Sequence, residues 1–116
     1  MPDVNIIGDI SYAISTIDAV SLTWAIVPGN NAWNVRNGIN YGETHAMVTD
    51  ISSGKAPLCH PIDIHFQASS TEGWPLIVME LWDRSLQEVK GFSGIGSAWL
   101  PSRPGKHVIP IHLWRP

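Results

Sequence analysis

The stretch HPIDIHFQASSTEGWPLIVMELWD, residues 60–83, determines the fold that we expect of this chain. In its first third, HPIDIHFQ, apolar and polar side chains alternate at spacing two, which is the pattern of a β-strand with one buried face. The alternation therefore predicts a core-facing set and an outward set. The core-facing residues are Ile62, Ile64 and Phe66, and the outward residues are Asp63, His65 and Gln67.

The last third of the stretch predicts a second strand, whose outward face is apolar except for one glutamate. The same period assigns the core-facing positions to Ile77, Met79 and Leu81. The outward residues are Leu76, Val78, Glu80 and Trp82. Between the two strands, SSTEG is a polar connector of the kind that joins neighbouring antiparallel strands, and its Gly73 can adopt a positive φ.

The remainder of the chain repeats this pattern, which is typical of an all-β sandwich. Apolar residues recur at spacing two more often than at three to four, and Gly, Pro, Asn and Ser interrupt the chain about every ten residues. No window predicts an amphipathic helix, and residues 50–59 are expected to form a connector. The length of 116 residues predicts one domain, residues 1–116. The expected strands are Val4–Ile10, Leu22–Val27, His45–Val48, Ile62–Gln67, Leu76–Trp82, Gly94–Leu100 and His107–Trp114.

Charge and composition exclude several classes of function. The net charge of −3, from 10 acidic and 7 basic residues without a run of one sign, gives no electrostatic footprint for nucleic acid. The N-terminal MPDVNIIGDI does not resemble a signal peptide, and no stretch approaches the roughly 18 apolar residues of a membrane span. The single cysteine, Cys59, cannot form an internal disulfide, which fits a reducing compartment. We therefore expect a soluble cytosolic protein that binds no nucleic acid.

The opening stretch contains candidate metal ligands, but the strand positions do not bring enough of them together. A metal site would need His60, Asp63 and His65 to converge. Pro61 favours an extended geometry for His60 at the strand entrance, so only Asp63 and His65 clearly share a face. Because a metal site needs three or four converging ligands, we expect these side chains to be solvated and no metal to be bound.

Two other motifs indicate structure rather than catalysis. Cys59 adjoins His60, but neighbouring side chains on an extended chain point apart, so we expect Cys59 to be a small buried side chain and not a nucleophile. The glycines of GFSGIG, residues 91–96, resemble a phosphate-binding loop, but the sequence that follows predicts a strand and not a helix. The sequence therefore predicts no enzymatic activity.

Two of the 6 tryptophans have positions that the pattern assigns. Trp24 belongs to an alternating apolar run and is expected in the core. Trp82 lies on the outward face with Leu76 and Val78, and an exposed apolar cluster of that kind indicates a partner surface. The alternative is that a neighbouring loop covers this cluster.

Several motifs, taken in order, resemble those of one family. Trp24 and Ile26 are followed by Gly29 and Trp33, then by GET at 42–44, HPIDIHF, GWP at 73–75, GFSGIG, PSRPG and the closing WRP. This order and spacing resemble the B9-domain proteins of the ciliary transition zone. The resemblance covers nearly the whole chain, from VNIIG to WRP.

The resemblance implies a C2-like antiparallel β-sandwich in a cytosolic scaffold at the basal body and transition zone of the cilium. It also implies partners, namely the other small B9 paralogue and the Meckel syndrome type one protein, in a complex that acts in cilium assembly and associates peripherally with the membrane. Proteins of the family continue beyond the position of WRP with sequence that looks like a final strand or strands. The expected sandwich therefore lacks its C-terminal strand or strands here.

Comparison with calcium-binding C2 domains implies that calcium is not a ligand. The residues WDRS, 82–85, resemble an acidic calcium loop, but Asp83 is the only carboxylate and Ser85 stands where a second is expected. Calcium prefers six to eight oxygen ligands with several carboxylates, and Arg84 and Lys90 oppose the cation. We expect no cofactor of any kind.

The sequence therefore predicts a non-catalytic interaction scaffold. The alternative is a calcium-independent lipid-binding C2-type module, which a basic concave patch would favour, and no such patch is visible in the sequence. The predicted partner surface combines the outward face of the 76–82 strand with the proline-framed turn at 101–105. Its residues are Leu76, Val78, Trp82, Pro101, Ser102, Arg103 and Pro104.

Overall fold

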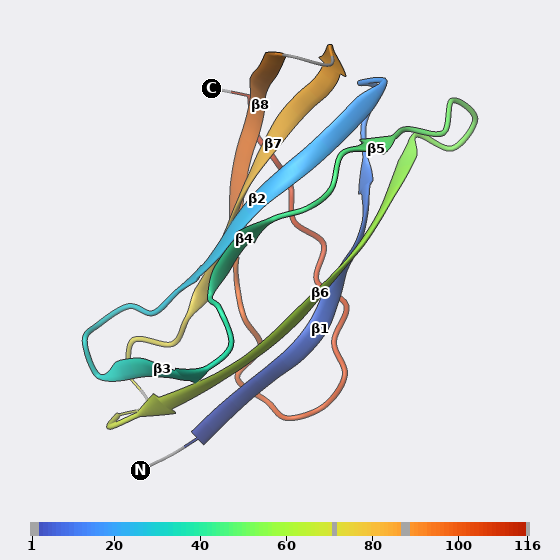
Figure 1. The fold of residues 1–116 in the computed structure, drawn as a ribbon. Coiled ribbons are helices and arrows are strands. Elements are labelled where there is room, and N and C mark those ends of the chain that lie inside the picture. Colours follow the sequence, from blue (N-terminus) through green and yellow to red (C-terminus); the bar gives the residue numbers. More distant parts are fainter. Residues whose placement is uncertain (1–2, 71, 87–88, 116) are drawn as a thin grey trace.

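The computed structural model describes residues 3–70, 72–86 and 89–115 and confirms an all-β sandwich of two antiparallel sheets (Figure 1). Within these ranges there are eight strands and no helix. The strand order of the first sheet is β1 (Asp3–Ile14), β6 (Lys55–Ala68) and β3 (Trp33–Asn37). The order of the second sheet is β4 (Tyr41–Glu43), β2 (Ala19–Val27), β7 (Leu76–Leu86) and β8 (Val89–Trp99), and β5 (Met47–Val48) also pairs with β2.

The core lies between the sheets and is built from the positions that the alternating pattern assigns to it. Ile64 and Phe66 of β6 are almost completely buried, and Met79 of β7 is buried opposite them in the same cluster. Trp24 of β2 is also buried, as expected. Burying a large apolar side chain contributes about 1.5–3 kcal/mol, so the confirmed strand phases explain what holds the sheets together.

The short strand β3 is a feature that the alternating pattern does not predict. Trp33 is its one buried residue. The Trp33 ring packs edge-on against Phe66 and Trp74, with ring centroids 5.9 and 5.2 Å away, and its Nε1 donates to the carbonyl of Glu72 at 2.8 Å. A strand anchored by a single side chain shows no periodicity. The strand β4 has three residues, which is too short for an alternating pattern to be visible in the sequence. The strand β5 is shorter than the expected His45–Val48.

The strand β6 begins at Lys55 and not at the expected Ile62, because its pairing with β1 continues on the other side of a bulge. Residues 55–59 do not form a connector, since Pro57 pairs with Tyr12 and His60 pairs with Ile10. Between these pairs β6 has one more residue than β1, and Cys59 adopts a φ of 48°. This bulge conformation leaves the Cys59 side chain exposed, so the prediction that it is buried is wrong.

The connector SSTEG crosses between the sheets and does not join neighbouring strands, so that part of the prediction is wrong. The strand before it, β6, belongs to the first sheet, and the strand after it, β7, belongs to the second. Gly73 has a φ of 75°, as expected, and its carbonyl accepts a hydrogen bond from the amide of Gly29 at 2.8 Å. A Cβ on Gly29 would lie 2.9 Å from Gly73 Cα, so two glycines allow the loops at this end to touch.

The strand expected at His107–Trp114 is not formed. After β8 the chain, orange to red in Figure 1, loops round the end of the sandwich and returns, and within this described segment Trp114 alone pairs with β8, opposite Ile95. A Cβ on Gly96 would overlap the carbonyl oxygen of His112, so the returning chain crosses close over β8 and cannot lie flat beside it. The residues of this segment that pack against the core are Ile111 and Leu113.

Candidate interaction face

The outward side of the second sheet consists of cross-strand rows in which β7 lies between β2 and β8. Directly paired residues of antiparallel strands point to the same side of a sheet. We call this surface the outer face of the second sheet. Its four rows are Val27, Leu76 and Trp99; Ala25, Val78 and Ser97; Thr23, Glu80 and Ile95; and Ser21, Trp82 and Phe92.

This face is apolar although it is open to solvent. Trp99 is 68% exposed, and Phe92 and Ile95 are each 42% exposed. Leu76 and Val78 of β7 are half-buried between them. Contiguous exposed apolar surface is uncommon on a monomeric soluble protein and marks a binding surface.

The outward side of the first sheet is mostly polar, with Ile7 as an exposed apolar residue. Its rows pair Asp3 with Gln67, Asn5 with His65, and Ile7 with Asp63. The polar side chains interact with one another, since His65 Nε2 lies 3.2 Å from Asp3 Oδ1. Apolar side chains are also exposed elsewhere, Ile7 and Ile14 of β1 among them, but the second sheet gathers them in adjacent cross-strand rows.

Trp82 is held in place by side chains of its own sheet. Its ring packs edge-on against Phe92, with centroids 5.3 Å apart, and Lys90 Nζ lies 4.4 Å from a Trp82 ring centroid. The Trp82 Nε1 donates to Thr23 Oγ1 at 3.1 Å, and the Thr23 hydroxyl donates to Glu80 Oε1 at 3.1 Å. Trp82 is therefore half-buried and oriented before any partner binds.

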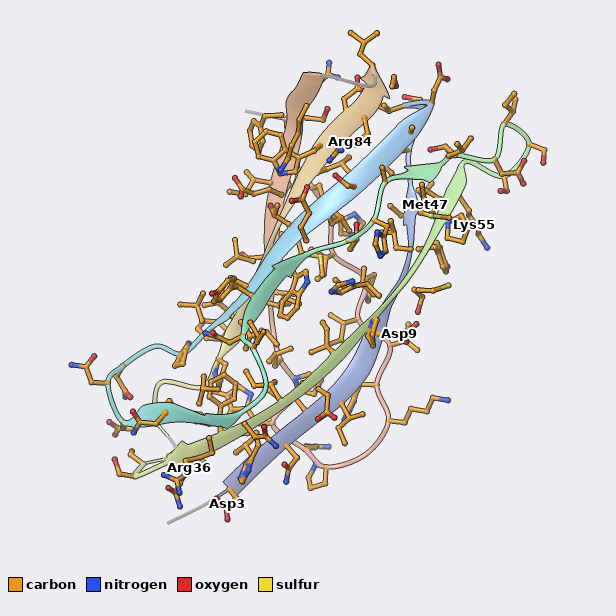
Figure 2. The ribbon with its side chains drawn as sticks, viewed as in Figure 1. Asp3, Asp9, Arg36, Met47, Lys55 and Arg84 are labelled. Atoms are coloured by element: carbon orange, nitrogen blue, oxygen red, sulfur yellow. The ribbon has the colours of Figure 1, made fainter. Side chains whose placement is uncertain are left out.

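Charged side chains surround the Trp82 end of the face. Glu43 Oε1 lies 3.3 Å from Arg84 Nη1 and 2.9 Å from Lys90 Nζ. Figure 2 shows Arg84 at the end of the sandwich far from Asp3 and Arg36. Partly exposed ion pairs of this kind contribute only about 0.2–1 kcal/mol, so their main effect is to order the side chains around Trp82.

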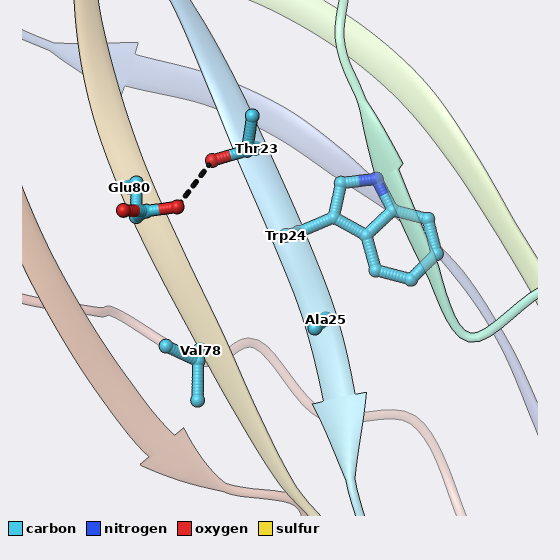
Figure 3. A pocket seen from close by; sticks show the side chains of 5 residues that line it. All are labelled: Thr23, Trp24, Ala25, Val78 and Glu80. Carbon is cyan, nitrogen blue, oxygen red and sulfur yellow. Dashed lines mark hydrogen bonds between the residues drawn. The ribbon is translucent and has the colours of Figure 1, made fainter.

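Two depressions in this face are too small for a small-molecule site. The larger, about 240 Å³, is lined by Leu76, Ser97, Ala98 and Trp99. The smaller, about 100 Å³, is lined by Thr23, Trp24, Ala25, Val78 and Glu80 (Figure 3). Small-molecule sites usually enclose roughly 300–1,000 Å³. Depressions of this size suit single side chains of a protein partner.

In the structure, the 101–105 turn of the predicted partner surface lies next to Leu76, whereas Trp82 lies far from the turn. Leu100, directly after β8, donates its amide to the carbonyl of Pro75 at 3.2 Å, which places the 101–105 turn beside Leu76. Trp82 lies six residues further along β7, which corresponds to about 20 Å at 3.3 Å per residue. The turn and Trp82 therefore belong to opposite ends of the same face.

The turn itself is well exposed. Ser102, Arg103 and Pro104 are exposed, whereas Pro101 is partly buried. His107 Nε2 lies within hydrogen-bonding distance of the Arg103 carbonyl, at 2.9 Å, and closes the turn. The exposed residues are available for contact with a partner.

The sequence interpretation omitted the residues that β8 adds to this face. Ile95, Ser97 and Trp99 alternate within the expected 94–100 strand, so the period that located Leu76 could have located them as well. Phe92 escapes this pattern because a register shift in β8 places it three residues before Ile95. The apolar surface is consequently wider than the sequence suggested.

The candidate metal ligands do not converge. Asp63 and His65 share the outward side of the first sheet, as expected, whereas the His60 ring packs edge-on against the buried Trp24 at 5.8 Å. In the part of the chain that the structure describes, no three His, Cys, Asp or Glu side chains are grouped so that they could hold a metal ion. The arrangement gives no support to a metal site.

The segment 82–85 lies inside β7 and is not a loop, so its resemblance to an acidic calcium loop does not extend to the structure. Asp83 Oδ1 accepts a hydrogen bond from the amide of Ser85 at 2.9 Å. Hydrogen bonds from the side chain and the backbone of Ser85 lower the pKa of the Asp83 carboxyl below its ordinary value of 3.8. The carboxylate is thus satisfied by its own strand.

Comparison with known proteins identifies the family. A family model described as ciliary basal body-associated, B9 protein matches residues 4–116. The chain belongs to this B9-C2 family. The C2-like sandwich that membership implies agrees with the two antiparallel sheets, and the family is described by its association with the ciliary basal body and not by a reaction.

The relatives of this B9 domain include both small B9-domain proteins. B9 domain-containing protein 2 of Mus musculus and of Homo sapiens are each 31% identical over 117 residues, which cover 100% of this chain and 66% of each relative. B9 domain-containing protein 1 of Xenopus laevis is 27% identical over 116 residues, covering 97% of this chain and 58% of the relative. The chain spans about two thirds of the length of the first relatives. No solved structure matches.

The family makes this chain a ciliary protein. Within the described ranges, no helix has the length and apolar character that crossing a membrane requires.

Proposed function

We propose that this B9 domain is a non-catalytic scaffold subunit of the ciliary transition-zone complex and acts in cilium assembly. It assembles at the ciliary base with another B9-domain paralogue and with the Meckel syndrome type one protein, and residues 1–116 act as one C2-like domain. The association of the family with the basal body supports the location. The similarity to both B9 domain-containing proteins supports a partner within the family.

The observation that carries this proposal is the outer face of the second sheet. Its rows are largely apolar and include the exposed side chains of Phe92, Ile95 and Trp99, whereas the paired residues on the outward side of the first sheet are mostly polar. Protein interfaces use such surfaces, with aromatic residues near their centre. Burial of Trp99, Leu76 and Val78 against a partner would remove apolar area from water, which the isolated domain leaves exposed.

The contact surface that we propose is that of Leu76, Val78 and Trp82 together with the turn Pro101, Ser102, Arg103 and Pro104. Trp82 is fixed by its hydrogen bond to Thr23, and the two prolines restrict the backbone of the turn. Groups that are ordered before association lose less conformational entropy on binding. The two ends of the face therefore form a preorganised contact surface about 20 Å long.

A charge placed in the centre of the face tests the proposal. Val78→Asp should weaken co-purification with the B9 domain-containing protein 1 of the same organism by at least about tenfold, because a buried unpaired carboxylate is costly at an interface. The matched control is Ile7→Asp, since Ile7 is 77% exposed on the outward side of the first sheet. Ile7→Asp should melt as the parent does, whereas Val78→Asp replaces a half-buried residue and should melt lower, so binding is compared at a temperature where both variants are folded. Equal binding by the two variants would exclude the outer face of the second sheet.

The turn is tested separately by charge reversal. Arg103 is exposed and forms no ion pair within the described residues, so Arg103→Glu should leave the melting temperature unchanged. We expect it to weaken co-purification with the same partner. Normal binding by Arg103→Glu, with loss of binding by Val78→Asp, would restrict the interface to the strands.

A further inference from the structure

The strand β1 lies at one side of the first sheet, and its second edge is open. It pairs with β6 without a break from Asp3, opposite Gln67, to Ile10, opposite His60. Across the described residues β1 pairs with no other strand, and no loop donates a backbone hydrogen bond to it or accepts one from it. Such an edge presents a row of free N–H and C=O groups, which is a template for another strand.

The other sheet edges are short or covered. The strand β3 has five residues, and β4 and β5 have three and two. The strand β8 is longer, but the returning C-terminal segment crosses close over it and Trp114 bridges to Ile95. Proteins commonly protect a long open edge with lysine, proline or a bulge. Residues 3–10 of β1, DVNIIGDI, contain neither lysine nor proline, and the bulge follows them.

Apolar side chains lie along the open edge on both sides of the sheet. Ile7 is 77% exposed on the outward side. Val4 and Ile6, on the core side, pack against the core and yet are only partly buried. A Cβ on Gly8 would meet nothing within 4 Å, so there is open space beside the middle of the strand. A strand added here would therefore bury apolar surface on both of its sides.

Charge determines which kind of strand this edge can accept. The outward side carries Asp3 and Asp9 of β1, both labelled in Figure 2, and Asp63 of the neighbouring β6. Asp3 lies 3.2 Å from His65, and Asp9 accepts a hydrogen bond from the Ser11 hydroxyl at 3.1 Å. Among the described residues, none of these carboxylates is paired with lysine or arginine. Two copies of β1 would gather carboxylates in one ribbon without a cation, whereas a basic strand would be attracted.

We propose that the open edge of β1 binds an extended basic segment of a partner protein by strand addition. The segment pairs antiparallel with residues 3–9, because antiparallel pairing is the more stable, and its backbone hydrogen bonds supply affinity. Its side chains supply the selectivity. Lysine or arginine lies opposite Asp9 and Asp3, and apolar residues lie opposite Ile7 and the core-side positions. This edge is separate from the outer face of the second sheet, so the inference goes beyond the proposed function.

A short peptide with this pattern tests the inference. In acetyl-Lys-Val-Val-Ile-Thr-Val-Lys-amide the two lysines lie opposite Asp9 and Asp3, and the second valine lies opposite Ile7. Fluorescence anisotropy of a labelled derivative measures its binding to the chain. We expect saturable binding that weakens as salt concentration rises. Replacing both lysines with glutamate should weaken binding by about tenfold or more, and hydrogen exchange of the β1 amides should slow when the lysine peptide is bound.

Two methylated peptides distinguish strand addition from any other mode of binding. Each carries N-methyl groups at alternate residues, and the two sets of methylated residues are complementary. In one peptide the methyl groups replace the donors that face β1, and in the other they lie on the far edge of the added strand. One methylated peptide should therefore bind and the other should not.

A matched pair of chain variants locates the site. Ile7→Lys places a cation at the middle of the open edge, so it should weaken binding of the basic peptide by at least about tenfold. The control is Ile51→Lys, the same change at a residue that is 100% exposed in the loop between β5 and β6. Both variants should melt as the parent does, because both side chains are exposed. Ile7→Lys should also leave co-purification with B9 domain-containing protein 1 unchanged, so failure of this inference and failure of the proposed function are distinguishable.

Several results would overturn the inference. These are absence of peptide binding, equal binding of the lysine and glutamate peptides, equal binding of the two methylated peptides, and equal binding by the two chain variants. A concentration-dependent dimer of the parent chain, measured by analytical ultracentrifugation and lost in Ile7→Lys, would show that a second copy occupies the edge instead.

Discussion

The indole Nε1 of Trp82 lies 3.1 Å from Thr23 Oγ1, and this hydrogen bond joins β7 to β2 across the outer face of the second sheet. The same hydroxyl donates to Glu80, so the three side chains form a short chain of hydrogen bonds on an otherwise apolar surface. Trp82 therefore contributes to the fold as well as to the candidate interface. Substitutions at this position must separate the two contributions.

Two substitutions of Trp82 should differ in their effect on stability. Trp82→Phe keeps an aromatic ring against Phe92 and removes the donor to Thr23, so we expect a loss of about 0.5–1.5 kcal/mol. Trp82→Ala removes the ring as well, and we expect a loss of about 2–3 kcal/mol for this half-buried side chain. Urea unfolding measures both values. Equal stability of the parent and Trp82→Ala would show that the packing of Trp82 adds nothing to the fold.

The core assignment of β6 predicts a contrast between neighbouring residues. Ile64 is 1% exposed, so Ile64→Ala should destabilise the protein by about 2–5 kcal/mol. His65 points outward, and within the described residues its side chain contacts the exposed Asp3, so His65→Ala should cost less than about 1 kcal/mol. Thermal melts of the two variants make the comparison. Equal shifts would contradict the assigned strand phase.

The period-two pattern predicted the strands in which every second residue is buried in the core. It could not predict strands with only one buried residue or with very few residues. The long strands β6 and β7 bury every second residue over much of their length, and this is what the sequence displays. The strand β3 is anchored only by Trp33, and β4 is three residues long, so neither shows a period. The bulge at Cys59 also escapes, because a single positive φ depends on the pairing with β1 and not on local sequence.

The sequence pattern located the part of the candidate interface that lies on one strand, but not the part that strand pairing adds. Leu76, Val78 and Trp82 follow from the phase of one strand, but the neighbours that widen the face come from β8 through pairing. The predicted strand at His107–Trp114 failed because Gly96 allows the returning segment to cross over β8. The contact between Gly96 and His112 joins segments far apart in the sequence, and no local pattern encodes it.

The turn after β5 predicts a dependence of stability on pH. Asp50 accepts hydrogen bonds from the amide and hydroxyl of Ser52 and from the hydroxyl of Ser53, at 3.0–3.1 Å. These bonds, that of the Ser53 side chain foremost, lower the pKa of the Asp50 carboxyl below its ordinary 3.8. The stabilisation is therefore present above the ordinary pKa and is lost as the pH falls through the lowered value.

Asp50→Asn should remove this contribution and reduce the fall of the melting temperature in acid. Melting temperatures recorded from about pH 5 to about pH 2 measure the change. Ser53→Ala should act in the same direction, since it removes the hydrogen bond with the largest effect on the Asp50 carboxyl. Acid profiles that match the parent in both variants would show that the Asp50 turn does not contribute to acid stability.

The approach of the C-terminal segment to β8 predicts opposite outcomes at two glycines. A Cβ on Gly96 would overlap the His112 carbonyl oxygen, so Gly96→Ala must displace the segment and should cost about 1–3 kcal/mol. A Cβ on Gly8 of β1 would meet nothing within 4 Å, so Gly8→Ala should be neutral or stabilise by about 0.4–1 kcal/mol. Urea unfolding gives the free energies, and hydrogen exchange at the Ile95 amide, which donates to Trp114 at 2.9 Å, reports the displacement. If Gly96→Ala matched Gly8→Ala in stability and protected the Ile95 amide as the parent does, the segment would not pack over β8.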